Sequence, residues 1–506
     1  MIALDAGTTG VRALAVDDAG AVVDVSYREI TQHFPRPGWV EHDPDEIWAQ
    51  LAACLVEVAQ RRRDAGDTVA ALGVTNQRET VVAWDRSSGA VLHRALVWQD
   101  RRTAARCDEL REEGRLPLVR ERTGLVLDPY FSATKMAWLV QTGAVADSAD
   151  LVLGTVDSWV LWNLTGGRDG GVLVTDTTNA SRTSLFDIAT RRWDAELAAC
   201  FGVPLRALCE VVPSCHTVGT VSGDVVSAAP GLRGVAVSGV AGDQHAALFG
   251  QACFAPHMAK VTYGTGSFVL ANVGGVCPPP AEGLLTTVAW DLGGHAADPR
   301  APVTYAYEGS VFATGAAIQW LRDGLGIIAD AAETGPLAES VPDSGGVVVV
   351  PAFSGMGSPY WDPYARGVVC GLSRGSGRAQ LARAVVEAMA FQVRDVVDAM
   401  VRHTGAALSE LRADGGAAVM DLLLQLQADQ LQVPVARPVS PETTAAGAAM
   451  LAGLASGVWG SLDELATLWA NDVSMRPAVD AEVADALHAG WLRAVDRARR
   501  WAAPGD

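Results

Sequence analysis

The chain has 506 residues, of which 49% are hydrophobic and 19% are charged, so it can fill more than one buried core, and disorder or collagen-like repeats are excluded. Acidic residues outnumber basic ones by 58 to 39, and the resulting net charge of -19 excludes an electrostatic surface for nucleic acid or anionic membrane. Only Lys135 and Lys260 are lysines, and neither lies in a P-loop pattern, so a phosphate ligand must be held by backbone amides, a metal ion or arginines.

The N-terminal segment has the pattern of an antiparallel meander. We expect strands over residues 2–5, 11–16 and 21–26, with a glycine- and threonine-rich turn, residues 6–10, between the first two. No basic leader or signal-type apolar run precedes the first strand, which predicts a cytoplasmic protein.

Strands and helices then alternate. Asp43 is an N-cap followed by Pro44 and two acids, which predicts a helix over residues 43–63. Apolar runs predict strands over 69–74 and 80–84, and a helix is expected over 100–113. This alternation is typical of α/β domains with mixed sheets.

A second strand–turn–strand segment occurs midway through the chain, with strands over 259–262 and 267–271 and a turn at 263–266. Its likeness to the first hairpin predicts two domains of similar architecture. A strand at 347–351 and a long helix at 380–403 follow. The uncharged stretch 443–462 is long enough to span a bilayer, but its small residues and two glycines favour a buried helix.

The two hairpins are candidates for binding phosphate. Glycines let the backbone approach an anion, and threonine hydroxyls add donors. Either turn alone is more often structural, but two of them can hold a polyphosphate from both sides. Asp5 could bind Mg²⁺ there, and Arg12 is the available cation. A third turn, residues 413–417, could accept a nucleotide base.

Acceptor-binding candidates lie in the first half of the chain. The adjacent Arg78 and Glu79 are either an ordinary surface pair or a set of donors and acceptors for a polyol. Trp98 and Tyr130 offer aromatic faces, although core packing is the usual role of such residues.

Taken together, these segments resemble the FGGY family of carbohydrate kinases, in particular its members that act on glycerol. The matching runs are residues 37–44, 75–80, 97–102, 127–131, 241–253, 263–266, 359–367 and 414–416. The resemblance implies an α/β fold with two ribonuclease-H-like (actin/hexokinase-type) domains, with mixed β-sheets, around a central cleft. We expect an N-terminal domain over 1–244 and a C-terminal domain over 245–506.

The resemblance also implies roles for individual residues. Asp243 would be the general base, and Asp5 would orient the metal. The residues that would bind the acceptor are Arg78, Glu79, Trp98, Tyr130, Asp243, Gln244 and Phe268. The residues that would bind the nucleotide are Thr8, Thr9, Arg12, Thr265, Gly266, Gly315, Gln319, Gly416 and Met420.

Three positions depart from the usual pattern of the members that act on glycerol. Gly10 replaces a serine, which removes a hydroxyl donor to phosphate, and Met420 replaces an asparagine at the adenosine turn. His245 stands where a second glutamine is usual.

The sequence therefore predicts an ATP- and Mg²⁺-dependent kinase that phosphorylates glycerol, with no nucleic-acid partner and no membrane span. One alternative is a sibling kinase acting on another polyol or on a ketopentose such as xylulose. Another is a non-catalytic ATP-binding regulator of the same fold. A homodimer or homotetramer is compatible with the resemblance, and the sequence leaves the oligomeric state open.

Overall fold

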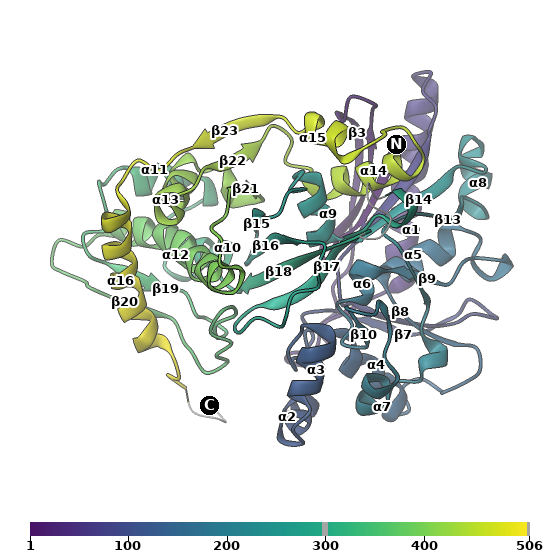
Figure 1. Ribbon diagram of the computed structural model, residues 1–506, viewed down its shortest axis with the longest axis horizontal. Coiled ribbons are helices and arrows are strands. Elements are labelled where there is room, and N and C mark those ends of the chain that lie inside the picture. The colour runs from purple at the N-terminus through teal and green to yellow at the C-terminus, as the bar shows by residue number, and fades with distance from the viewer. Residues whose placement is uncertain (296–301, 503–506) are drawn as a thin grey trace.

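The computed structural model describes residues 1–295 and 302–502. Its N-terminal half, on the right of Figure 1, is built on a six-stranded sheet in the order β13-β14-β5-β1-β2-β3. Strands β1, β2 and β3 form the predicted antiparallel meander, and β5 and β14 run parallel to β1. The strands are β1 (Ile2–Ala6), β2 (Gly10–Val16), β3 (Val22–Glu29), β5 (Ala71–Asn76), β13 (Cys215–Thr220) and β14 (Ala236–Gly242).

The C-terminal half repeats this arrangement. Its seven-stranded sheet has the order β17-β18-β16-β15-β21-β22-β23, in which β18-β16-β15-β21-β22 corresponds to β3-β2-β1-β5-β14. The strands are β15 (Met258–Tyr263), β16 (Ser267–Gly274), β17 (Leu285–Asp291), β18 (Val303–Val311), β21 (Glu410–Asp414), β22 (Val435–Pro438) and β23 (Asn471–Met475). The expectation of two similar α/β domains with mixed sheets is confirmed.

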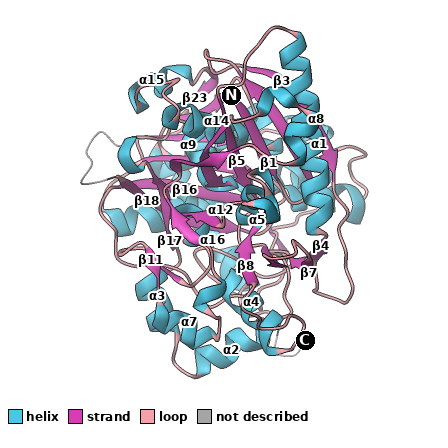
Figure 2. Ribbon diagram, turned by 90° about the vertical axis from the view of Figure 1, so that its right-hand side faces the viewer, coloured by secondary structure: helices cyan, strands magenta, loops and turns pink. Residues whose placement is uncertain are grey.

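Helix α1 (Pro44–Asp64) covers one face of the first sheet. The Asp43 side chain accepts hydrogen bonds from the backbone N–H groups of Asp45 and Glu46, as its position as N-cap predicts. The helix packs Leu51 and Leu55 against the sheet. Helix α14 (Thr443–Ala455) lies on the opposite face, so the first sheet is covered on both sides (Figure 2).

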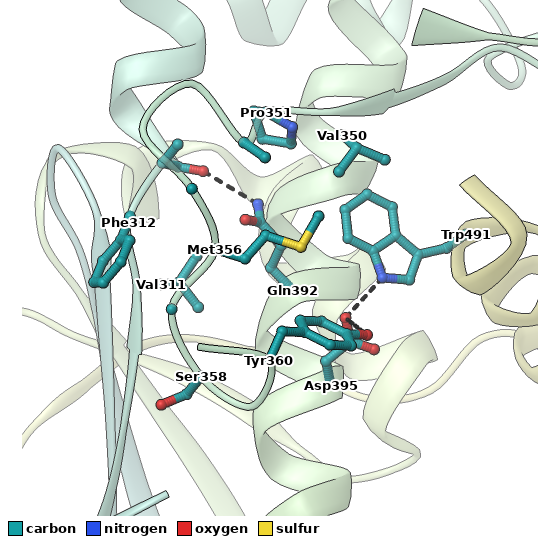
Figure 3. A pocket seen from close by; sticks show the side chains of 14 residues that line it. Val311, Phe312, Val350, Pro351, Met356, Ser358, Tyr360, Gln392, Asp395 and Trp491 are labelled. Atoms are coloured by element: carbon teal, nitrogen blue, oxygen red, sulfur yellow. Dashed lines mark hydrogen bonds between the residues drawn. The ribbon is translucent and has the colours of Figure 1, made fainter. Parts of the chain in front are cut away.

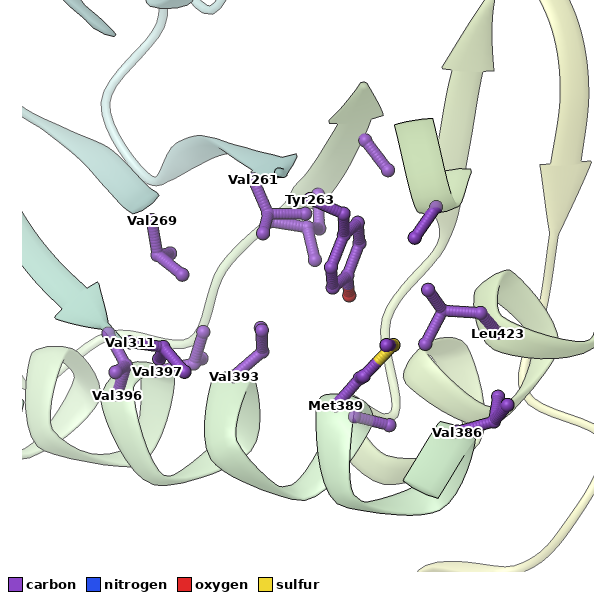
Figure 4. Close-up of a cluster of buried hydrophobic side chains, with 14 of the residues drawn as sticks. Val261, Tyr263, Val269, Val311, Val386, Met389, Val393, Val396, Val397 and Leu423 are labelled. Carbon is purple, nitrogen blue, oxygen red and sulfur yellow. The ribbon is translucent and has the colours of Figure 1, made fainter. Parts of the chain in front are cut away.

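Helix α12 (Arg378–Thr404) supports the second sheet. Met389, Val393 and Val397 on this helix lie in one cluster with Val261 and Val269 of the sheet (Figure 4). Burial of each such side chain contributes about 1.5–3 kcal/mol, so this face of α12 fixes the helix on the sheet.

Helices α9 (Asp243–Gly250) and α14 cross each other between the two sheets. A β-carbon on Gly250 would collide with the Thr443 carbonyl, and one on Gly447 would collide with that of Ala246. These glycines permit the close crossing. α14 ends at Ala455 and is a short buried helix, as predicted for this stretch. In the described part of the chain, no helix has both the length and the hydropathy needed to cross a membrane.

Smaller elements complete the fold. A four-stranded sheet in the N-terminal half has the order β4-β7-β6-β8. Its strands are β4 (Glu41–His42), β6 (Val81–Asp85), β7 (Val91–Leu96) and β8 (Leu151–Thr155). Two-stranded sheets are formed by β9 (Val174–Asp176) with β12 (Glu210–Val212), β10 (Phe186–Asp187) with β11 (Arg192–Trp193), and β19 (Val348–Val350) with β20 (Val368–Cys370).

The other helices of the N-terminal half are α2 (Ala104–Glu112), α3 (Leu116–Thr123), α4 (Ser132–Gln141), α5 (Val156–Leu164), α6 (Thr177–Ala180), α7 (Ala195–Phe201) and α8 (Asp224–Ala228). Those of the C-terminal half are α10 (Gly315–Gln319), α11 (Thr334–Glu339), α13 (Asp421–Leu431), α15 (Leu462–Leu468) and α16 (Ala481–Ala498).

The predicted helix over 100–113 starts later than expected, at Ala104. Asp100 does not cap it. Its carboxylate accepts hydrogen bonds from the backbone N–H groups of Val40 and Arg102, which holds residues 100–102 in a turn.

Candidate active site

The first hairpin joins β1 to β2, and its charged residues pair across the strands. Asp5 lies directly opposite Arg12, whose Nε donates to Asp5 Oδ2 at 2.8 Å. Nη1 of Arg12 donates to Glu442 Oε2 at 2.6 Å, next to the start of α14. Thr9 is exposed, and Thr8 Oγ1 accepts from the Trp98 indole at 3.0 Å. The hairpin thus presents hydroxyls and backbone beside a fixed guanidinium.

Asp5 is the candidate metal ligand. In residues 1–295 and 302–502, no group of three or more His, Cys, Asp or Glu side chains could hold a metal ion. Mg²⁺ is usually bound by one or two carboxylates together with substrate phosphates and water.

Arg78 and Glu79 follow β5 and are buried, so they are not the surface pair that was one of the two interpretations. Nε of Arg78 lies 3.2 Å from Asp243 Oδ1, and its Nη2 lies 3.3 Å from the Tyr130 hydroxyl. Glu79 has φ of 62°, an uncommon conformation for a residue with a side chain. Strained backbone of this kind is concentrated at functional sites.

Two buried charges that the sequence did not indicate complete this cluster. Glu308 on β18 accepts hydrogen bonds from both nitrogens at the end of Arg78, at 2.6 and 3.0 Å. Arg182, which follows α6, donates to Glu79 at 2.7 Å and to Glu308 at 3.0 Å. Because Glu308 belongs to the second domain and both arginines to the first, this cluster connects the domains.

Asp243 is the accessible acid of the cluster. Its side chain is 30% exposed, whereas those of Arg78, Glu79 and Glu308 are at most 2% exposed. Burial raises the pKa of Asp243 to about 6; Arg78 opposes the rise and Glu79 adds to it. Burial also acts to raise the pKa of Glu308, but the charges of Arg182 and Arg78 outweigh it and lower that pKa to about 2.

Aromatic rings from both domains meet beside Asp243. The ring centroids of Trp98 and Tyr130 are 5.6 Å apart, and those of Trp98 and Phe268 are 6.4 Å apart, both in edge-to-face geometry. The Arg78 guanidinium carbon lies 5.8 Å from the Phe268 ring centroid. Together the three rings form an apolar wall beside the Arg78 guanidinium.

Both lysines of the chain are buried and hydrogen-bond to residues that carry the site. Nζ of Lys260 donates to Gln244 Oε1 and, at 2.9 Å, to Thr262 Oγ1. Nζ of Lys135 donates to the carbonyls of Pro129, Tyr130 and Phe131 at 2.7–2.8 Å. Lys260 therefore orients the Gln244 amide, and Lys135 fixes the loop that carries Tyr130.

The second hairpin, between β15 and β16, is built by close backbone approach. A β-carbon on Gly315 would lie 2.5 Å from the Gly264 carbonyl oxygen, and one on Gly266 would collide with the Val311 carbonyl. Thr265 is exposed at the turn, and its carbonyl accepts from the N–H groups of Thr314 and Ala316 at 3.0 Å.

The candidate residues for the nucleoside lie around this hairpin and β21. Gln319 is exposed at the end of α10, and Gly416 is exposed with open space where a β-carbon would be. Met420 is half-buried and packs against the second domain's core next to Gly335. These residues come from two segments of the second domain, α10 and the 3₁₀ turn at Gly416–Val419 with Met420 after it.

A further pocket lies between α12, α16 and the loop before Tyr360 (Figure 3). Asp395 accepts hydrogen bonds there from the Trp491 indole at 2.8 Å, His488 at 2.7 Å and the Tyr360 hydroxyl at 3.0 Å. Because the Asp395 carboxylate already accepts three hydrogen bonds from the protein, two of them from α16, we interpret its role as fixing α16 against α12.

Two repeated sheets, each with a glycine-containing hairpin, and an accessible carboxylate between them are the arrangement of a two-domain protein of the ribonuclease-H-like class. The FGGY carbohydrate kinase N-terminal domain matches residues 1–250, and the C-terminal domain of the same family matches residues 259–456. The chain belongs to the FGGY family of carbohydrate kinases.

Relatives matched over almost their whole length are identical to this chain at about half of the aligned positions. A glycerol kinase of Citrifermentans bemidjiense is 50% identical over 99% of both chains, and glycerol kinase 2 of Thermotoga maritima is 49% identical over the same shares. Among solved structures, Plasmodium falciparum glycerol kinase with ADP has a TM-score of 0.91 and 32% identity, covering 98% of both chains. Xylulose kinase from Rhodospirillum rubrum has a TM-score of 0.84 and 26% identity, covering 97% of both.

Proposed function

We propose that this protein transfers the γ-phosphoryl group of ATP to glycerol and forms sn-glycerol 3-phosphate. The relatives named glycerol kinase, about 50% identical over the full length, support glycerol as the acceptor. The observation that carries the proposal is Asp243, an accessible carboxylate with a pKa raised to about 6, whose Oδ1 lies 3.2 Å from buried Arg78.

Asp243 is the general base of this reaction. At neutral pH a carboxyl group with a pKa near 6 is mostly ionised, yet it is basic enough to accept a proton from an attacking hydroxyl. The glycerol oxygen forms a bond to the γ-phosphorus, the bond from that phosphorus to the β–γ bridging oxygen breaks, and the hydroxyl proton moves to Asp243. Arg78 keeps the carboxylate oriented toward the acceptor.

The acceptor is bound by hydrogen bonds to its hydroxyls and by apolar contact to its carbons. Arg78, Glu79, Tyr130 and Gln244 provide the hydrogen bonds together with Asp243 itself. Trp98 and Phe268 line the carbon skeleton and limit its length, since their rings come from the two domains and meet edge to face.

The nucleotide lies between the hairpins. Thr8, Thr9, Arg12, Thr265 and Gly266 hold its phosphates. Gly315, Gln319, Gly416 and Met420 line its nucleoside end. Asp5 would hold Mg²⁺, which supplies positive charge to the phosphate oxygens as negative charge develops on them.

The domain division at 244/245 is also part of this proposal. Residues 1–244 would bind the acceptor and carry the first phosphate hairpin, and residues 245–506 would carry the second phosphate hairpin and bind the nucleotide. The division falls in the first turn of α9, which begins at the base Asp243. Cytoplasmic localisation and a homodimer or homotetramer remain predictions from the sequence.

The proposal is tested by kcat/KM for glycerol, propane-1,2-diol and xylulose under one condition. A site built to hydrogen-bond a hydroxyl rejects the analogue that lacks it by up to ~10⁴-fold, so propane-1,2-diol should be a very poor substrate. If xylulose has the highest kcat/KM, the sibling kinase is correct and glycerol is wrong. If ATP binds but no acceptor is phosphorylated, the protein is a regulator.

The Phe268→Ala variant tests the size limit. Removing the ring opens the wall opposite Trp98, so the preference for glycerol over xylulose should narrow while kcat/KM for glycerol falls. An unchanged preference would show that Phe268 does not set the acceptor length.

A further inference from the structure

Tyr27 lies beside the first hairpin, but it is not among the residues proposed above to bind the nucleotide. It is on β3 directly opposite Arg12 of β2, and Arg12 is opposite Asp5 of β1. The three side chains therefore line one face of the sheet. This is the face on which α14 packs, because Leu14, two residues from Arg12, lies in the same cluster as the α14 residues.

The ring of Tyr27 occupies the place of a side chain at residue 10. A β-carbon on Gly10 would lie 2.5 Å from the Tyr27 hydroxyl oxygen and 2.6 Å from two of its ring carbons. The backbone itself does not require glycine there, since Gly10 is absent from the residues with positive φ. Glycine at residue 10 is thus explained by Tyr27 and by nothing in the local conformation.

The Tyr27 hydroxyl is available to a ligand. None of the residues in the described ranges forms a hydrogen bond with it, and 53% of the residue is exposed. The hydroxyl reaches the first position of β2, at the end of the Gly7–Thr9 turn. Tyr27 therefore brings a donor to the hairpin from the neighbouring strand, where a serine at residue 10 would have brought one from the hairpin itself.

We propose that Tyr27 is a nucleotide-positioning residue that donates its hydroxyl to a phosphate oxygen of the bound nucleotide. This inference rests on the proposed function, because it takes the first hairpin to be a phosphate site. Arg12, held by Asp5 and Glu442, supplies the fixed charge beside it, and the phenol supplies a directional hydrogen bond.

The first test measures binding of ADP and of adenosine by titration calorimetry. A hydrogen bond to a charged group contributes enough that its loss weakens binding roughly tenfold, so Tyr27→Phe should raise the Kd for ADP by about that factor. Adenosine, which lacks phosphates, should bind the variant and the wild type equally. Val25→Ala, at the next position on the same face of β3, is the matched control and should leave both Kd values unchanged.

The second test moves the hydroxyl donor from residue 27 to residue 10. Gly10→Ser alone should raise KM for ATP, since its side chain collides with the ring, and Tyr27→Ala alone should raise it through loss of the donor. The double variant Gly10→Ser/Tyr27→Ala has room for the serine and regains a hydroxyl, so its KM for ATP should be lower than that of either single variant. KM for glycerol should stay constant in all three.

The outcomes separate this inference from the proposed function. ADP binding needs no acceptor, so the first test stays valid even if glycerol is not the substrate. Wild-type ADP affinity in a folded Tyr27→Phe variant would overturn the role of the hydroxyl. A double variant no better than its parents would overturn the exchange between residues 10 and 27.

Discussion

The Glu308→Gln substitution should destabilise the protein strongly, because it removes the negative charge shared by two buried arginines. Arg78 and Arg182 both donate to Glu308, and all three side chains are at most 2% exposed. Breaking a buried ion pair by neutralising one partner costs about 3–5 kcal/mol. With roughly 2–4 °C of Tm per kcal/mol for domains of this size, Tm should fall by about 6–20 °C.

The loss should depend on pH. Because the pKa of Glu308 is lowered from its ordinary value of 4.5 to about 2 in the folded protein, its charge stabilises the fold above pH 4.5, and this contribution is lost as the pH falls toward 2. The Tm difference between wild type and variant should therefore narrow over this interval.

Thermal unfolding by circular dichroism measures both effects. Asp150→Asn is the control, since Arg86 and Asp150 form an exposed pair, 50% and 45% exposed, and such pairs contribute at most about 1 kcal/mol. If the Glu308→Gln variant has the same Tm as the Asp150→Asn control, the interpretation that the Glu308 carboxylate stabilises the fold by pairing with Arg78 and Arg182 is refuted.

Three further predictions concern catalysis and the nucleotide. Asp243→Asn should lose roughly 10²–10⁴-fold in kcat with little change in the Kd for ADP, and near-normal turnover would end its assignment as the base. Glu79→Gln should shift the acid limb of kcat/KM, expected near pH 6, to lower pH, because the Glu79 charge raises the pKa of Asp243; a shift to higher pH would contradict this. Met420→Asn should tighten ATP binding and increase the preference for ATP over other triphosphates, whereas an unchanged preference would mean that Met420 serves only the core against which it packs.

Local patterns predicted the fold well. Apolar alternation interrupted by glycine and threonine located both hairpins, and the N-cap Asp43 located the start of α1 within one residue. These features depend on neighbours in the chain, so the sequence displays them directly. The start of α2 was predicted early because the Asp100 carboxylate bonds to Val40, a contact between distant residues.

The site was only partly predictable for the same reason. Arg78 and Asp243 lie in recognisable motifs, but their partner Glu308 is a single acid within an apolar strand. A charged residue at a buried strand position was the available signal. Only the folded structure, in which Glu308 accepts hydrogen bonds from Arg78 and Arg182, shows that its partners are these arginines. Tyr27 had no local signal, since its relation to Gly10 comes from the packing of one strand on another.

The burial of both lysines has a consequence for the chemistry of the protein's surface. Lys135 and Lys260 are 0% exposed, and burial lowers the pKa of each to about 8, so each amine would be more reactive than an ordinary lysine if it became exposed, but in the folded protein it is inaccessible. The folded chain therefore presents no lysine amine to acetylation or to amine-reactive dyes. Rapid acylation of either lysine would then report opening of the active-site region, which makes these two amines native probes of local unfolding.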